Sequence, residues 1–311
     1  MQRQLERRWL APFAVDVGSV LSVHRRGIGD PAYVIDQAGA IWRASRTPDG
    51  PGTLRIAWRS ERADQSGVTL ADARAWGPGA GWLLDSLPAM LGAEDKPEDF
   101  VPAHPVLRDL ARRHGTVRIG RSGLVLESLV PAALEQKVVG KEAWRAWRLL
   151  LRMFGEPAPG PVPAGMRVPP EPVTWASIPS WEWHRAGVEA VRAQTIAAAA
   201  RVAGRLEEIL GLPPAQADRR LQSLSGIGAW TSAEVRQRAC GDPDAVSVGD
   251  YHLPAIVGMA LVGRPVNDAE MLELLAPCHG HRHRASVLAW FSGARPARRG
   301  PRLPVRDYRA I

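Results

Sequence analysis

Residues 224–233 read LSGIGAWTSA, in which two glycines, Gly226 and Gly228, flank one apolar residue and a helix-like run follows directly. Glycines allow a tight path and the close approach of another backbone. The preceding residues, 218–224, are helix-like as well, so the unit reads as helix, hairpin, helix. Its turn presents unpaired N–H groups at the positive end of a helix dipole, which attract an anion such as a phosphate. An ordinary tight connection between two helices is the alternative.

Further along the chain, a loop rich in Asp, Pro and Gly leads into another helix-like segment. Residues 242–253 read DPDAVSVGDYHL, and Asp250 stands at the expected start of that helix. An aspartate in this position is usually a helix cap. It can also be a catalytic carboxylate that points into a cleft. Asp242 and Asp244 in the same loop are rival candidates for that role.

The composition describes a folded protein with a basic surplus. The 311 residues are 45% hydrophobic and 23% charged, with a net charge of +8. Phosphates attract such a surplus, which favours a nucleic-acid partner, whereas an arginine-rich surface that only sets solubility is the alternative. The sequence has no apolar run of about 18 residues and no secretory signal, which excludes a membrane span. Two cysteines cannot form a disulfide framework, so we expect a cytoplasmic protein.

The pattern of the first third predicts an α+β domain. Strand-like runs at residues 32–36, 39–44 and 53–59 are separated by turn residues, and the last run alternates polar and apolar side chains. We therefore expect an N-terminal domain with an antiparallel sheet over residues 1–110.

From there on, helix-like segments dominate. They predict an all-α region over residues 111–295, with a break at Gly140. Proline and glycine crowd residues 155–170, which predicts a loop or short linker. Residues 296–311 form a basic C-terminal tail.

The hairpin and the following aspartate loop together resemble the helix-hairpin-helix, glycine/proline-aspartate superfamily of DNA glycosylases. Gln136 matches the glutamine-containing helix of that superfamily. The segments ARAWGPGA (73–80) and LG (91–92) extend the resemblance to the AlkA-like 3-methyladenine DNA glycosylase II family. This resemblance implies a sheet-containing N-terminal domain followed by a helical helix-hairpin-helix domain.

The resemblance also implies roles for individual residues. Asp250 matches the catalytic aspartate. The residues expected to bind the DNA backbone are Gly226, Gly228, Ala229 and Thr231. The residues expected in the pocket for the flipped base are Trp230, Tyr251 and Trp290. Gln136 and Lys137 are expected near the gap that the flipped base leaves, although the best-known family member has an apolar wedge where this chain has Lys137.

The expected activity follows from these matches. Members that cut the strand attack the sugar with a hairpin lysine, and this chain has Trp230 in that place. The resemblance therefore implies a monofunctional glycosylase that flips alkylated purines of the 3-methyladenine type out of double-stranded DNA and leaves an abasic site. The alternatives are a non-catalytic DNA-damage sensor and a glycosylase for deaminated or oxidised bases.

The resemblance and the residues also bear on ligands and assembly. We expect a monomer without a cofactor, apart from a monovalent cation that hairpin carbonyls can hold in the family. We expect no metal site at the run CHGHRH (278–283), because alternate positions do not share one helical face.

Overall fold

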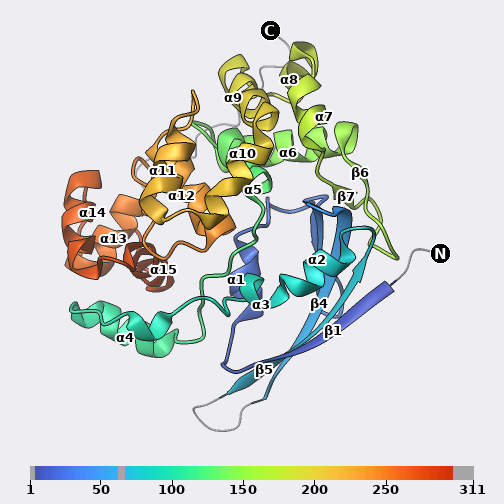
Figure 1. Cartoon of the computed structure of the whole chain (residues 1–311). Helices are drawn as coiled ribbons and strands as arrows, with labels where there is room; N and C mark the ends of the chain where they lie inside the picture. The colour runs from blue at the N-terminus through green and yellow to red at the C-terminus, as the bar shows by residue number, and fades with distance from the viewer. Residues whose placement is uncertain (1–3, 62–66, 297–311) are drawn as a thin grey trace.

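The computed structural model describes residues 4–61 and 67–296. The predicted basic tail lies outside the described residues, except for Pro296. The chain forms a sheet at one end and a body of helices at the other (Figure 1). None of the helices in the described ranges has the length and the apolar character needed to cross a lipid bilayer.

The N-terminal sheet is antiparallel and five-stranded, with the spatial order β1-β5-β4-β3-β2. The sequence predicted β2, β3 and β4 but not β1 or β5. The strands are β1 (Gln4–Ala11), β2 (Tyr33–Ile35), β3 (Ile41–Thr47), β4 (Gly50–Glu61) and β5 (Val68–Trp76). Side chains alternate between the two faces along each strand, so each face can have its own chemistry.

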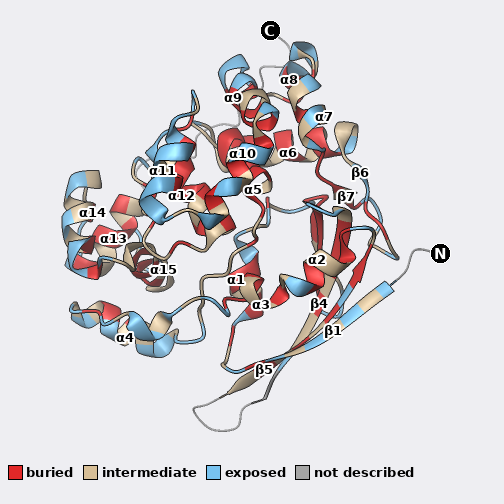
Figure 2. Ribbon diagram, viewed as in Figure 1, coloured by how far each residue is buried: buried red, intermediate tan, exposed pale blue. Residues whose placement is uncertain are grey.

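The inner face of the sheet packs against three short helices. These are α1 (Val17–Ser22), α2 (Ala80–Asp85) and α3 (Leu87–Met90). Leu54 and Ile56 on β4 are at most 1% exposed and belong to the same apolar cluster as Leu83 of α2. Figure 2 shows the buried residues that this packing produces along the strands beneath α2.

The outer face is partly covered by the predicted proline- and glycine-rich segment. This segment contains two short paired strands, β6 (Glu156–Pro157) and β7 (Arg167–Val168). Its apolar residues pack on Trp42 and Trp76, whose rings stack with centroids 5.4 Å apart. The segment is therefore an ordered cover for part of the sheet.

The helical body has its largest core around α5, a nearly fully buried helix. The break predicted at Gly140 is confirmed, because α5 ends at Leu134 and α6 begins at Gly140. Buried residues of α6 recur every three or four positions, which directs one face of that helix into the core. The helices of this core are α5 (Val125–Leu134), α6 (Gly140–Phe154), α7 (Pro172–Ser177), α8 (Ser180–Arg185), α9 (Ala190–Arg201), α10 (Ala203–Glu207), α11 (Pro214–Gln222) and α12 (Ala229–Val235).

A second helical cluster is built mainly from the C-terminal part. Its helices are α4 (Pro105–Arg113), α13 (Leu253–Val262), α14 (Asp268–Leu275) and α15 (Arg282–Phe291). Leu107 and Leu110 of α4 are buried in this cluster. The boundary at residue 110 stays a prediction, and the packing of α4 associates it with the C-terminal helices.

Candidate active site

The glycine turn connects two helices. It lies between the end of α11 at Gln222 and the start of α12 at Ala229. Gly226 has a φ of +84°, a conformation that residues with a Cβ atom rarely adopt, whereas Gly228 is extended with a φ of −96°. Gly228 and Ala229 are exposed. The first helical N–H groups have no partner within the helix, and the two that begin α12 therefore belong to surface residues.

Two side chains from distant parts of the chain hold this turn. Gln136, just beyond α5, donates from Nε2 to the carbonyl oxygen of Gly226 and to Oγ1 of Thr231, both at 2.8 Å. Thr195 of α9 lies so close to Gly226 that a Cβ there would overlap its hydroxyl. The conformation of the turn is thus fixed by contacts that lie outside the hairpin.

Lys137 follows Gln136 and is exposed. Its φ of +55° is the only positive φ of a non-glycine residue in the described ranges. Such a conformation is sparsely populated for a lysine and persists only where the surroundings hold it. The bonds of Gln136 to the hairpin hold the backbone next to Lys137.

Asp250 contacts the helix that follows the glycine turn. Its Oδ2 accepts a hydrogen bond from the indole Nε1 of Trp230 at 3.1 Å. Its Oδ1 accepts from the backbone N–H groups of His252 and Leu253, at 2.7 and 2.8 Å, and so caps α13. Asp250 is therefore a helix cap, one of the two roles that the sequence left open, and its catalytic role stays a prediction. Its second oxygen faces α12 at the hairpin.

The rival aspartates are used elsewhere. Asp242 is buried and forms an ion pair with Arg236 at 2.5 Å. Asp244 accepts hydrogen bonds from the backbone N–H and from the guanidinium of Arg282. Burial acts to raise the pKa of Asp244, but these bonds and the charge of Arg282 outweigh it, so the pKa is lowered. These ion pairs anchor the start of the loop, which leaves Asp250 as the carboxylate that faces the hairpin.

Further contacts hold the rest of the aspartate loop. Ser247 donates to Oε1 of Glu234 at 2.6 Å, and Gln237 donates to both Ser247 and the carbonyl of Ala245. The N–H of Gly249 donates to Asp268. Glu234 lies one turn beyond Trp230 on the same helix, so α12 both contacts Asp250 and positions its loop. No pattern in the sequence indicated these supporting residues.

Comparison with solved structures places this arrangement in a known fold. The 3-methyladenine DNA glycosylase from Archaeoglobus fulgidus superposes with a TM-score of 0.70 at 17% identity, over 92% of this chain and 97% of that one. The 8-oxoguanine glycosylase/lyase from Clostridium acetobutylicum, bound to double-stranded DNA, gives 0.67 at 10% identity, over 94% and 97%. The 3-methyladenine DNA glycosylase of Schizosaccharomyces pombe, bound to abasic DNA, gives 0.52 at 17% identity, over 63% and 95%.

The chain has the fold of the helix-hairpin-helix DNA glycosylases. The predicted architecture, an antiparallel sheet domain followed by a helical hairpin domain, is confirmed. No family model matches the sequence, and no curated protein matches it either. At these low identities the likeness is one of fold.

Within this glycosylase fold, the predicted site residues separate into two groups. In the first group, Gln136 is hydrogen-bonded to Gly226 and Thr231, and Trp230 is hydrogen-bonded to Asp250. Thr231 as a whole residue is only 2% exposed, and its hydroxyl is bonded to Gln136.

Within the described ranges, no hydrogen bond or ring contact joins the two other predicted pocket aromatics, Tyr251 and Trp290, to that group. Tyr251 is 84% exposed and its ring meets the edge of His252. Trp290 on α15 is 50% exposed, and the guanidinium of Arg295 lies 4.4 Å from the centre of its ring. Their place in a base pocket remains a prediction.

A polar cluster that the sequence did not indicate lies around Arg238, in the helical turn that directly follows α12. Arg238 forms an ion pair with Glu234 at 2.7 Å and donates to the carbonyl of Val23. Burial, assisted by Arg238 and Arg284, lowers the pKa of His283 to about 3. Burial, with Arg43, Arg26 and Arg238, also lowers the pKa of His24. Both imidazoles are therefore neutral at pH 7. Within the described ranges, no cluster of His, Cys, Asp and Glu is suited to a metal ion.

Proposed function

We propose that this protein is a monofunctional DNA glycosylase that releases alkylated purines of the 3-methyladenine type from double-stranded DNA and leaves an abasic site for base excision repair. The observation that carries the proposal is the direct bond between Asp250 and Trp230. It brings a carboxylate to the helix that begins at the glycine turn. The shared fold with DNA glycosylases supports it.

The proposed chemistry requires a carboxylate near the sugar. Breaking the bond between a base and deoxyribose builds positive charge on the sugar, as in glycoside hydrolysis. A fixed carboxylate stabilises that charge and can orient or deprotonate the attacking water. The three contacts of Asp250 all come from N–H donors, which suits an ionised, acceptor-only carboxylate. Because they also fix its rotamer, the group needs little reorganisation during the reaction.

The absence of strand cleavage is part of the proposal. A Schiff base needs an amine at the sugar, and Trp230 occupies the hairpin position of the lyase lysine. The three lysines of the chain lie elsewhere: Lys96 precedes a short helical turn before α4, Lys137 follows α5, and Lys141 is in α6. The nitrogen of Trp230 is bonded to Asp250 and is not a nucleophile.

The DNA contacts in this proposal come from the turn. The exposed residues Gly228 and Ala229 are proposed to offer their N–H groups to a phosphate. Gly226 and the buried Thr231 are proposed to shape the turn for this contact, since both are bonded to Gln136. Lys137 adds a positive charge where we expect the flipped-base gap. The net charge of +8 supports association with a polyanion.

The flipped base is proposed to rest against Trp230, Tyr251 and Trp290. Alkylated purines such as 3-methyladenine carry positive charge, and each aromatic face attracts such a cation by about 0.5–2 kcal/mol. A monovalent cation at the hairpin also belongs to the proposal. The carbonyl of Gly226 accepts from Gln136 and that of Leu224 from Ile227, and each oxygen retains a second lone pair for such an ion. We further propose a cytoplasmic monomer.

The test is base release under single-turnover conditions from duplexes that carry 3-methyladenine, 7-methylguanine, hypoxanthine or 8-oxoguanine. The wild type should release the methylated purines, and Asp250→Asn should lower the rate by about 100-fold or more with DNA affinity retained. Asp268→Asn is the matched control, because it changes a neighbouring carboxylate that contacts the same loop at Gly249. Its rate should stay within about 3-fold of the wild type, because an asparagine keeps that acceptor oxygen.

Three outcomes would contradict the proposal. Release of 8-oxoguanine alone would favour a glycosylase for oxidised bases, an alternative that the fold likeness to an 8-oxoguanine glycosylase/lyase supports. Strand cleavage through an intermediate trapped by borohydride would show lyase chemistry. Binding to damaged duplexes without release of any base would indicate a damage sensor.

A further inference from the structure

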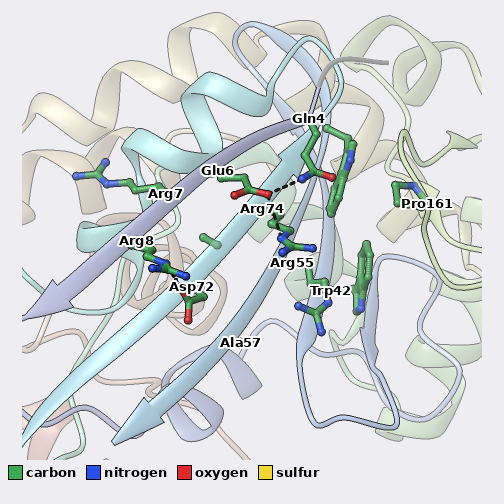
Figure 3. Close-up of a pocket in the computed structure, with 12 residues that line it drawn as sticks. Gln4, Glu6, Arg7, Arg8, Trp42, Arg55, Ala57, Asp72, Arg74 and Pro161 are labelled. Carbon is green, nitrogen blue, oxygen red and sulfur yellow. Dashed lines mark hydrogen bonds and ion pairs between the residues drawn. The ribbon is translucent and has the colours of Figure 1, made fainter. Parts of the chain in front are cut away.

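A pocket of about 590 Å³ lies on the outer face of the N-terminal sheet, far from the hairpin in the sequence (Figure 3). Its lining comes from β1, β3, β4 and β5 and from Pro161 in the covering segment, and none of it comes from α11, α12 or the aspartate loop. The site proposed above therefore leaves this pocket without a role.

The pocket forms where the covering segment ends over the sheet. Gly160 lies against the ring of Trp76, and Pro161 stands at the pocket wall. Beyond this point the outer face is open. Ala57 contributes only a methyl group to the lining, which leaves a depression among longer side chains.

Strand register places charged side chains in a row across the opening. Glu6 is opposite Arg74, Arg74 is opposite Arg55, and Arg55 is opposite Trp42 on β3. Like charges directly opposite each other in an antiparallel sheet repel. The Arg55–Arg74 pair is therefore an arrangement that an anion between the two guanidinium groups would stabilise.

The carboxylates nearby satisfy these arginines only in part. Asp36 is 3.3 Å from one terminal nitrogen of Arg55, but it also accepts from the indole N–H of Trp42 and from two backbone N–H groups. These bonds, first the one from Trp42, lower the pKa of Asp36. Glu6 is 3.3 Å from Nε of Arg74 and also accepts from Gln4.

The remaining guanidinium donors are open to a ligand. In the part of the chain that the structure describes, neither terminal nitrogen of Arg74 has a protein acceptor, and the side chain is 54% exposed. Arg8, paired with Asp72, adds a third guanidinium at the edge. Arg7 also belongs to the lining residues but points to the other side of β1, as Figure 3 shows. Arg55, Arg74 and Arg8 each have one carboxylate partner, Asp36, Glu6 and Asp72 respectively, and these pairs leave guanidinium N–H donors over for a ligand.

We propose that this pocket is a second binding site that takes a phosphate group between Arg55 and Arg74. Guanidinium groups in a fork geometry match phosphate oxygens and form strong charge-assisted hydrogen bonds with them. The centre of the Trp42 ring lies 5.6 Å from the guanidinium carbon of Arg55, and this cation–π contact helps to hold the Arg55 side chain in place. A free phosphate compound and a nucleic-acid strand present the same group, so both are sources to be distinguished.

The test uses inorganic pyrophosphate and isothermal titration calorimetry on the full chain. Wild type should bind it saturably, and the double variant Arg55→Gln, Arg74→Gln should bind it ~10-fold more weakly or worse. Arg59→Gln is the matched control, because Arg59 is on the same face of β4 and outside the pocket lining. Thermal unfolding of each variant confirms that the sheet is intact. Unchanged binding in the double variant, or an equal loss in Arg59→Gln, would overturn the proposal.

A second arm identifies the source of the phosphate. A labelled single-stranded thymidine oligonucleotide is titrated with the same variants in fluorescence anisotropy. A parallel loss of its affinity in the double variant assigns the site to a nucleic-acid strand, whereas a loss for pyrophosphate alone assigns it to a free phosphate compound. Base release should be the same in the double variant and the wild type, and Asp250→Asn should keep its pyrophosphate binding. A failure of the proposed glycosylase activity would therefore leave this result standing.

Discussion

Replacing the two glycines of the hairpin turn by alanine, one at a time, should affect the stability of the fold very differently. Gly226 has a φ of +84°, and a Cβ on it would overlap Oγ1 of Thr195 and lie 3.1 Å from two more atoms of that side chain. Gly228 is extended, and a Cβ on it would meet nothing within 4 Å. We therefore expect Gly226→Ala to destabilise the fold and Gly228→Ala to leave it intact.

The magnitude follows from two contributions. A left-handed conformation costs an alanine about 1–2 kcal/mol. Overlap with a packed side chain costs about 1–3 kcal/mol more, since either the turn or α9 must shift. Gly226→Ala should therefore lower the free energy of unfolding by about 2–5 kcal/mol, and Gly228→Ala by about 0.5 kcal/mol or less.

Urea unfolding measures both effects. With a denaturant slope of about 3 kcal/mol/M, the midpoint of Gly226→Ala should fall by about 1 M. Adding Thr195→Ala removes the overlapping hydroxyl and should recover about 1–3 kcal/mol, which leaves the backbone contribution. Equal shifts for the two glycine variants, or no recovery in the double variant, would refute the idea that Thr195 and a left-handed Gly226 define the turn.

Further predictions concern the pH dependence, the cap and the lysine. His283 has a pKa of about 3 in the folded protein, so below pH 6.5 the unfolded chain binds more protons at this residue than the folded chain does. The free energy of unfolding should therefore fall as the pH drops from 6.5 towards 3, by about 2 kcal/mol at pH 5. Urea midpoints at pH 8 and 5 should differ less in His283→Gln, and an unchanged difference would contradict this origin. Asp250→Ala should lower the free energy of unfolding by about 0.5–2 kcal/mol because it removes the cap of α13, whereas Asp250→Asn keeps the cap. Equal urea midpoints for these two variants would exclude the capping role. Lys137→Gly relieves a strained φ. It should also reduce the slope of log affinity for DNA against log salt concentration by about one, because one phosphate contact is lost. The same slope in this variant and in the wild type would show that Lys137 does not contact a phosphate.

The sequence predicted the strands with clear signals and missed the others for a physical reason. β2, β3 and β4 contain apolar runs or alternation between turn residues. β1 reads QLERRWLA and lies at the edge of the sheet with charged side chains on its outer face, so its composition suggests no buried strand. β5 lies between β1 and β4, but alanines fill its inner positions, where close packing against helices leaves little room. Small residues carry a weak strand signal even where they are fully buried.

What the sequence determined by itself is local: a glycine turn between two helices, an aspartate at the start of a later helix, and a tryptophan instead of a lysine on the hairpin. Tertiary structure alone decided that Gly226 is the constrained glycine, that Asp250 and not Asp242 or Asp244 faces α12, and that Gln136 holds the turn. The reason is that short-range patterns record backbone propensity and capping, whereas a side chain's partner depends on which distant segments pack beside it. Thr195 constrains Gly226, and Arg236 binds Asp242. No sequence pattern connects either residue with the site.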